Sequence, residues 1–386
     1  MTTSLRLKAY DAIVIGARCA GAATAMLLAC GGARVLCVDH ALPGTDTVST
    51  HALMRLGVTQ LARWGVLDAI RQAGTPPVRR TLFHYGDETL AVDIRPSPQG
   101  DMLHAPRRTV LDLALVRAAA EAGVEFRFGT SFAGTVCGTS GHVAAAVLRH
   151  ADGAAETVRT GLLVGADGRR SAVARAVAAP IEIEGSHAAA VAYAYAEGLP
   201  NEGYRWAYVP GAGGGIIPTN GGQSCVFLAL SPERLRPELG DRSPKAFQAA
   251  LARHLPTLAE VMSGARIAGR VIVHPGAKGF VRRAVGPGWA LVGDAGYFKD
   301  PITAHGITDA LRDAEMLASA VLAGRPAAFP VARAPLIEGF FRLTDEIASF
   351  DWSLDQLKAM HVALNTEMKR GQRWADAQGD VLGHAA

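Results

Sequence analysis

The chain has 386 residues, of which 49% are hydrophobic and 19% are charged. This length and apolar content suffice for one or two packed cores and exclude a disordered chain. The 39 lysines and arginines nearly balance the 35 acidic residues, and no basic run of five occurs, so we expect no nucleic-acid partner. No apolar run reaches the roughly 18 residues of a membrane-spanning helix, so we expect no membrane span.

The cysteines predict neither a disulfide framework nor a metal site. They are odd in number, widely separated and without a C-x-x-C pair: Cys19, Cys30, Cys37, Cys137 and Cys225. The N-terminal region lacks the pattern of a secretory signal. We therefore expect a cytoplasmic protein.

The first forty residues predict a strand, a glycine turn, a helix and a second strand. Residues 10–15 and 33–38 are apolar runs typical of buried strands, and residues 22–30 form a small-residue helix that ends at Gly31-Gly32. Two strands and a helix within about 30 residues predict the right-handed crossover of a nucleotide-binding sheet.

The later elements follow from periodicity and turn residues. Helical spacing occurs at 50–72, 108–122, 246–262 and 306–322, and residues 331–386 are mainly helical. Strand patterns occur at 124–128, 162–164 and 289–292, in a hairpin over 81–94, and across 181–231, where Gly211–Gly215 indicates a hairpin turn. Aromatic residues alternate with small ones in 193–208, so one face either lines a substrate cavity or packs in the core.

The glycine turn Gly16-Ala17-Arg18-Cys19-Ala20-Gly21 predicts a dinucleotide site. Its first and last glycines allow a tight turn and close helix packing, and the helix start offers N–H groups to a pyrophosphate, although Arg18 replaces the usual middle glycine. Asp39 follows Gly21 by 18 residues, beside His40, and can accept hydrogen bonds from an unphosphorylated ribose. This favours FAD or NAD over NADP; the alternative is a turn with no ligand.

Two later segments each lead from a buried strand into a Gly-Asp turn. The first contains Gly165-Ala166-Asp167-Gly168, and the second contains Gly293-Asp294-Ala295 and continues through Pro301 to Gly306. A carboxylate at such a turn suits the hydroxyls of a cofactor, but aspartate after a strand is also a common helix cap. Both interpretations of Asp167 and Asp294 stay open.

We predict an α/β fold with a Rossmann-like nucleotide-binding domain, an inserted antiparallel-sheet substrate domain and a helical C-terminus. The predicted nucleotide domain comprises 10–80, 101–180 and 271–325, the substrate domain comprises 81–100 and 181–270, and the C-terminal helices comprise 326–386.

With these motifs in this order, the chain resembles the flavoprotein monooxygenases of the p-hydroxybenzoate hydroxylase type. That superfamily also contains geranylgeranyl reductases and flavin-dependent halogenases. The resemblance covers most of residues 10–325 and implies an FAD-dependent oxidoreductase. The family pattern after Asp167 is matched through Ser171 and Val173, but Ala174 stands where arginine is usual.

The resemblance also implies roles for individual residues. FAD would be held by Gly16, Arg18, Cys19, Ala20 and Gly21 at the pyrophosphate, Asp39 and His40 at the adenosine, Arg108 near the ribityl region, Asp167, Gly293 and Asp294 at the turns, and Thr50, Pro301, Gly306 and Ile307 around the flavin. A helix that starts at Gly306 would stabilise the negative charge of a reduced flavin. His305 and Pro301 are the catalytic candidates, and His305 is either a proton relay or a packing residue.

The expected reaction is a monooxygenation. NADH or NADPH would reduce FAD, O₂ would form a flavin C4a-hydroperoxide, and a hydrophobic, aromatic or polyketide-like small molecule would be hydroxylated. An FAD-dependent alkene reductase of the geranylgeranyl type is the alternative, and a non-catalytic flavin-binding protein is a third. Halogenation is disfavoured because no lysine lies between Lys8 and Lys245 and Arg205–Pro210 lacks the W-x-W-x-I-P pattern.

Overall fold

The computed structural model describes residues 9–96 and 102–378. Its first layer is a parallel sheet with the strand order β19-β10-β1-β2-β7. These strands are β1 (Ala9–Ile15), β2 (Val35–Asp39), β7 (Glu125–Phe128), β10 (Ala155–Gly165) and β19 (Trp289–Leu291). Three strands extend this sheet in antiparallel pairing: β8 (Ser131–Cys137), β9 (Val143–Arg149) and β18 (Val285–Gly286).

The central strands are buried on both faces because each face has its own cover. Ala12 and Val14 of β1 pack in one core with the helices, whereas Ile13 and Ile15 pack in another with β9 and α5. The helices on the two sides are α1 (Cys19–Cys30), α2 (Arg55–Arg63), α3 (Leu67–Gln72), α4 (Arg108–Glu121), α5 (Ala172–Ala176) and α9 (Gly306–Leu322).

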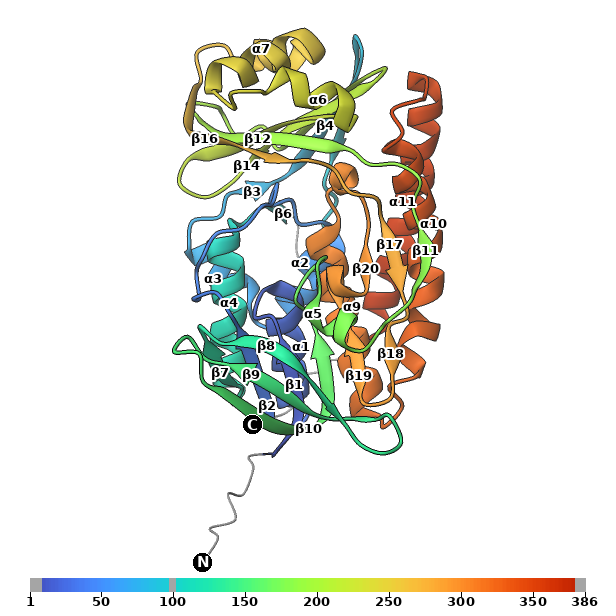
Figure 1. The fold of residues 1–386 in the computed structure, drawn as a ribbon. Coiled ribbons are helices and arrows are strands. Elements are labelled where there is room, and N and C mark those ends of the chain that lie inside the picture. The colour runs from blue at the N-terminus through green and yellow to red at the C-terminus, as the bar shows by residue number, and fades with distance from the viewer. Residues whose placement is uncertain (1–8, 97–101, 379–386) are drawn as a thin grey trace, which may run out of the picture.

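A second, seven-stranded sheet lies above the first in Figure 1 and has the order β16-β12-β15-β14-β13-β4-β5. Its strands are β4 (Arg80–Tyr85), β5 (Glu88–Asp93), β12 (Ala190–Glu197), β13 (Tyr204–Val209), β14 (Ala212–Pro218), β15 (Gln223–Leu230) and β16 (Arg266–His274). All neighbours are antiparallel except β4 and β13. Helices α6 (Pro232–Glu238), α7 (Pro244–His254) and α8 (Pro256–Val261) cover its outer face.

The alternation of aromatic and small residues divides this sheet between two cores. Tyr193, Tyr195 and Trp206 belong to the core shared with the nucleotide-binding layer, whereas Ala192 and Ala194 face the outer helices. The aromatic face is therefore mostly core, although Tyr193 also reaches the large cavity described below.

The C-terminal helices α10 (Ala328–Ile347) and α11 (Leu354–Asp376) run side by side along one edge of the molecule, past both sheets (Figure 1). His361 of α11 accepts or donates a 2.7 Å hydrogen bond with the Tyr85 hydroxyl of β4, and Gln372 donates to Thr59 of α2. Helix α11 thus contacts both layers. Short strands complete the fold: β3 (Pro77–Val78), β6 (Leu103–His104), β11 (Ile181–Glu184), β17 (Phe280–Arg282) and β20 (Tyr297–Phe298).

The mixed α/β architecture is confirmed, but three local predictions were wrong. The helix expected over 50–72 begins only at Arg55 and breaks at Gly65, and the one expected over 246–262 breaks before Pro256, whose ring cannot continue it. Strands β8 and β9 were not predicted. The predicted domain boundaries stay predictions, including those in residues 97–101 and 379–386, which lie outside the described residues.

Gly21 lies where α1 packs closely against the glycine turn of the first β-α-β crossover. A larger side chain at this position tests how much the fold depends on that close approach. A Cβ at Gly21 would overlap the Gly16 carbonyl oxygen, whereas a Cβ at Gly134 in β8 would meet no atom within 4 Å. We expect Gly21→Ala to cost at least about 2 kcal/mol of unfolding free energy, because backbone atoms must move. Urea unfolding of both variants measures this. Equal stability of Gly21→Ala and Gly134→Ala would contradict it.

Candidate active site

One cavity of about 710 Å³ lies beyond the carboxyl ends of β1, β2 and β10, where parallel sheets commonly bind ligands. It reaches from the glycine turn to the second sheet. All the predicted site residues line it except Gly21, Gly293 and His305. Those that do are Gly16, Arg18, Cys19, Ala20, Asp39, His40, Thr50, Arg108, Asp167, Asp294, Pro301, Gly306 and Ile307.

The glycine turn brings α1 to one wall of the cavity. Gly16 has a φ of +103°, and a Cβ there would press on the Ala166 carbonyl. Arg18 has an ordinary extended backbone with φ −86°, so this position needs no glycine. Its guanidinium turns sideways to Thr45 and Asp112, and no side chain caps the N-terminus of α1. The first N–H groups of α1 are therefore available to a ligand.

Asp39 holds the loop that follows β2. Its carboxylate accepts hydrogen bonds from the backbone N–H groups of Ala17 at 2.8 Å and Ala41 at 2.9 Å. It therefore fixes the glycine turn, and it lines the cavity with the exposed His40. A carboxylate has about four lone-pair sites, so these two bonds leave acceptors for a ribose.

Arg108 is a buried cation on the same wall. Its guanidinium makes a bidentate pair with Asp112, one turn along α4, at 3.0 to 3.1 Å. It also donates to Cys19 Sγ at 3.5 Å. Burial raises the pKa of the Cys19 thiol to about 11, so this sulfur is protonated near neutral pH and is no nucleophile.

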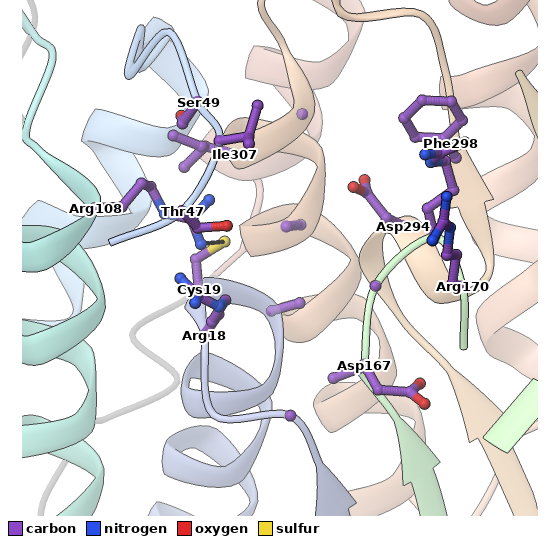
Figure 2. Close-up of a pocket in the computed structure, with 18 of the residues that line it drawn as sticks. Arg18, Cys19, Thr47, Ser49, Arg108, Asp167, Arg170, Asp294, Phe298 and Ile307 are labelled. Atoms are coloured by element: carbon purple, nitrogen blue, oxygen red, sulfur yellow. Dashed lines mark hydrogen bonds between the residues drawn. The ribbon is translucent and has the colours of Figure 1, made fainter. Parts of the chain in front are cut away.

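The two Gly-Asp turns differ in the contacts that their carboxylates make. Asp167 accepts from the Ser171 hydroxyl and from the N–H groups of Ala172 and Val173, so its carboxylate caps α5. Asp294 makes no side-chain hydrogen bond within the described ranges. In Figure 2 the Asp294 carboxylate points into the cavity, whereas that of Asp167 points away.

The surroundings of Asp294 favour a ligand contact. The side chain is exposed to the cavity, which protein surrounds only in part, and burial within the fold raises the Asp294 pKa, opposed by the charges of Lys299 and Arg108. Hydroxyl donors from a ligand would stabilise the ionised carboxylate.

The N-terminus of α9 forms the wall beside Asp294. The 3-10 turn Pro301–Thr303 and Ala304, with a φ of +54°, direct the chain into the helix, and no side chain caps its first N–H groups. Gly306 and Ile307 line the cavity at this point. Met54 donates to the Thr308 hydroxyl at 3.1 Å and so ties the loop after β2 to this helix.

His305 lies behind this wall. Its Nδ1 contacts the Thr303 carbonyl at 2.5 Å, and its ring packs 4.5 Å from the Phe340 ring. Burial lowers the pKa of His305 to about 3. A ring that stays neutral and does not line the cavity favours the packing interpretation over a proton relay.

The sequence analysis missed a buried chain of charges behind α9. Lys299 lines the cavity and pairs with Asp309, which is followed by Arg312, Asp313 and, on α10, Arg333. Charged residues among the apolar positions of 306–322 were the available signal. The absence of a lysine between Lys8 and Lys245 therefore did not mean that the cavity lacks one.

Comparison with known protein families identifies the chain. A model of the FAD binding domain family matches residues 9–325. The chain belongs to this family. It is an FAD-dependent oxidoreductase, and its cavity fits FAD because two uncapped helix N-termini and a free carboxylate open into it.

The individual relatives share low sequence identity with this chain. The chain is 27% identical to a digeranylgeranylglycerophospholipid reductase of Methanosarcina mazei over 80% of this chain and 74% of that protein. The fold is shared with PqsL of P. aeruginosa in complex with 2-aminobenzoylacetate, at TM-score 0.79 and 20% identity over 92% of this chain and all of that one. The flavin-dependent brominase Bmp2 gives TM-score 0.78 and 18% identity over 96% and 100%.

Within residues 9–96 and 102–378, every helix is too short or too polar to cross a membrane. The same residues contain no group of three or more His, Cys, Asp or Glu side chains placed to hold a metal ion.

Asp300, next to Pro301, predicts a pH-dependent stability. Its carboxylate accepts from Ala189 N at 2.6 Å and Ile302 N at 2.9 Å, and burial raises its pKa to about 7. An unfolded Asp releases its proton near pH 4, so the folded state binds more protons between about pH 4 and 7 and loses stability as the pH rises. Relative to Asp300→Asn, wild type should lose on the order of 2 kcal/mol across this window.

Chemical unfolding of both proteins from pH 4.5 to 7.5 measures that difference. Other groups titrate equally in the two proteins and cancel. A difference independent of pH would show that Asp300 ionises normally in the fold.

Proposed function

We propose that this protein is an NADH- or NADPH-dependent monooxygenase that hydroxylates an aromatic or polyketide-like small molecule in the cytoplasm. The observation that carries the proposal is the opening of two uncapped helix N-termini, those of α1 and α9, into one cavity that also borders the second sheet. Bound FAD would accept a hydride from the nicotinamide donor and activate O₂ for transfer of one oxygen atom.

We propose a role for the residues on each wall of the cavity. The α1 N-terminus would bind the FAD pyrophosphate, and the N–H groups of Gly306 and Ile307 would stabilise negative charge on the reduced flavin. Asp294 would accept hydrogen bonds from ribityl hydroxyls. The buried apolar side chains Val191 and Ile307 would exclude water from the reacting groups.

Coupled turnover tests the proposal. The purified holoenzyme should oxidise NADH or NADPH faster when a substrate from a panel of phenols and polyketides is added. We expect one O₂ consumed per hydroxylated product, measured with an oxygen electrode and mass spectrometry with ¹⁸O₂. Product that contains no ¹⁸O would contradict a monooxygenase.

A reductase that passes hydride to an alkene is the second candidate, favoured by the similarity to the Methanosarcina mazei reductase. It needs the same cofactor but no oxygen. Anaerobic reduction of a prenyl lipid by the holoenzyme would support it, whereas strict dependence of product on O₂ would exclude it.

Asp294 provides a test of cofactor binding. Loss of a charged hydrogen-bond acceptor costs about 1.5–3 kcal/mol, so Asp294→Ala should weaken FAD binding at least about tenfold. Flavin fluorescence quenching on titration of the apoprotein measures the Kd. Asp68→Ala, at an exposed position of α3, is the control. An unchanged Kd in a folded Asp294→Ala variant would remove Asp294 from the site.

A further inference from the structure

Strand β5 forms an open edge of the second sheet. It pairs with β4 over its whole length without a register shift, and no described strand pairs with its other side. All residues of Glu88–Asp93 are exposed, and the side chains of Leu90 and Val92 are 50% and 42% exposed. A regular, partly apolar strand with free backbone groups is a place where another strand can be added.

The other sheet edges that the structure describes have features that hinder such pairing. Strand β16 shifts register against β12 and contains Gly269 with a φ of +80°, and β8 shifts register twice against β9. Strands β3, β6, β7, β11, β18 and β20 have only two to four residues. By contrast, β5 has six residues, no proline and an uncharged centre. This contrast indicates that the β5 edge has a partner.

The direction of the backbone groups of β5 limits the register of an added strand. Ile94 N donates to the carbonyl of Arg79, just before β4, at 2.8 Å. Backbone groups alternate in direction along a strand, so the even-numbered residues of β5 face β4. Thr89, Ala91 and Asp93 therefore direct their N–H and C=O groups outward. An added strand must form its hydrogen bonds with these three residues.

This pattern fits a second copy of the same strand. When two copies of β5 pair antiparallel about a two-fold axis at Ala91, Ala91 faces Ala91 of the other copy and Thr89 faces Asp93. All these residues direct their backbone groups outward, so about six backbone hydrogen bonds form. In the same register Leu90 faces Val92 of the other copy, an apolar cross-strand pair that forms twice.

Charges at the two ends of β5 support the same register. Asp87, before the strand, and Arg95, after it, are exposed, and neither forms an ion pair with another described residue. In the two-fold pairing Asp87 of one copy lies opposite Arg95 of the other, so opposite charges meet at both ends. Glu88 and Asp93 are already paired with cations of their own chain. No like charges face each other in this register.

We propose that this protein forms a two-fold symmetric dimer through β5, which joins two seven-stranded sheets into one continuous sheet. The same surface of each copy forms the interface. No residue of β5 lines the cavity, so this inference goes beyond the proposed function and does not depend on it. Two short strands bury a small area, so we expect a Kd on the order of 10 μM.

Sedimentation velocity of the FAD-loaded full chain, from about 1 to about 200 μM, tests the dimer. Wild type should change from monomer to dimer over this range. Ala91→Pro removes an outward N–H, and Leu90→Lys places a charge opposite Val92, so each should raise the Kd at least about tenfold. Ile183→Lys, a similar change at an exposed residue of edge strand β11, is the control and should associate as wild type does.

Exchange of the end charges tests the register. Asp87→Arg or Arg95→Asp alone brings like charges together twice in each dimer and should raise the Kd at least about threefold. The double variant restores opposite charges and should return the Kd to within about twofold of wild type. Hydrogen–deuterium exchange should show slower exchange of the β5 amides at high protein concentration than at low concentration.

Three results would overturn the proposal. They are a wild type that stays monomeric over the whole range, a dimer whose Kd is unchanged in both Ala91→Pro and Leu90→Lys, and a double charge variant that associates no better than the single ones. Thermal unfolding and flavin content show whether each variant is folded. Asp87 and Arg95 lie outside the strand, so their variants test the pairing even if Ala91→Pro does not fold.

Discussion

The structure depends on the convergence of unsatisfied backbone N–H groups from two helices on one enclosed space. Helix α1 reaches it because Gly16 and Gly21 let the turn, the helix and β10 approach to backbone contact. Helix α9 reaches it from a part of the chain nearly three hundred residues later, through the turn that Asp300 caps. Neither terminus is closed by a side chain, so both offer N–H groups to a ligand with negative charge or acceptor atoms.

Sequence reasoning succeeded where a local pattern determines a local structure. The strand and glycine-turn pattern of the first forty residues and the helical periodicity of 306–322 predicted β1, α1, β2 and α9, and the structure contains these elements with small shifts at their ends. It failed where the secondary structure of a segment depends on the segments that pair with it or pack against it. Strand β8 has no fully buried residue and β9 is rich in alanine, and they form because β9 pairs with β10 and β8 pairs with β9.

The same division applies to the site. The positions of the glycines and aspartates could be predicted from the turn motifs, but the contacts that each carboxylate makes could not. Asp167 and Asp294 lie in nearly identical Gly-Asp turns. The Asp167 carboxylate caps α5, whereas the Asp294 carboxylate points into the cavity. Pairings between separate elements, such as Arg333 of α10 with Asp313 of α9 or Arg169 with Phe298, depend on tertiary placement. The sequence signalled only that charged residues lie among the apolar positions of 306–322.

The contacts of helix α11 affect how molecules can reach the cavity. It is hydrogen-bonded to the second sheet through His361 and to α2 through Gln372, so a clamshell-like separation of the two layers would have to break one of these contacts. Entry and exit by movement of shorter pieces of chain would leave both contacts intact. The part around Val48 in the segment between β2 and α2 is best suited, since Val48 is half exposed, whereas hydrogen bonds anchor the stretch from Ser49 to Met54. Substrate entry and product release would therefore depend on the movement of a loop and not on a hinge between domains.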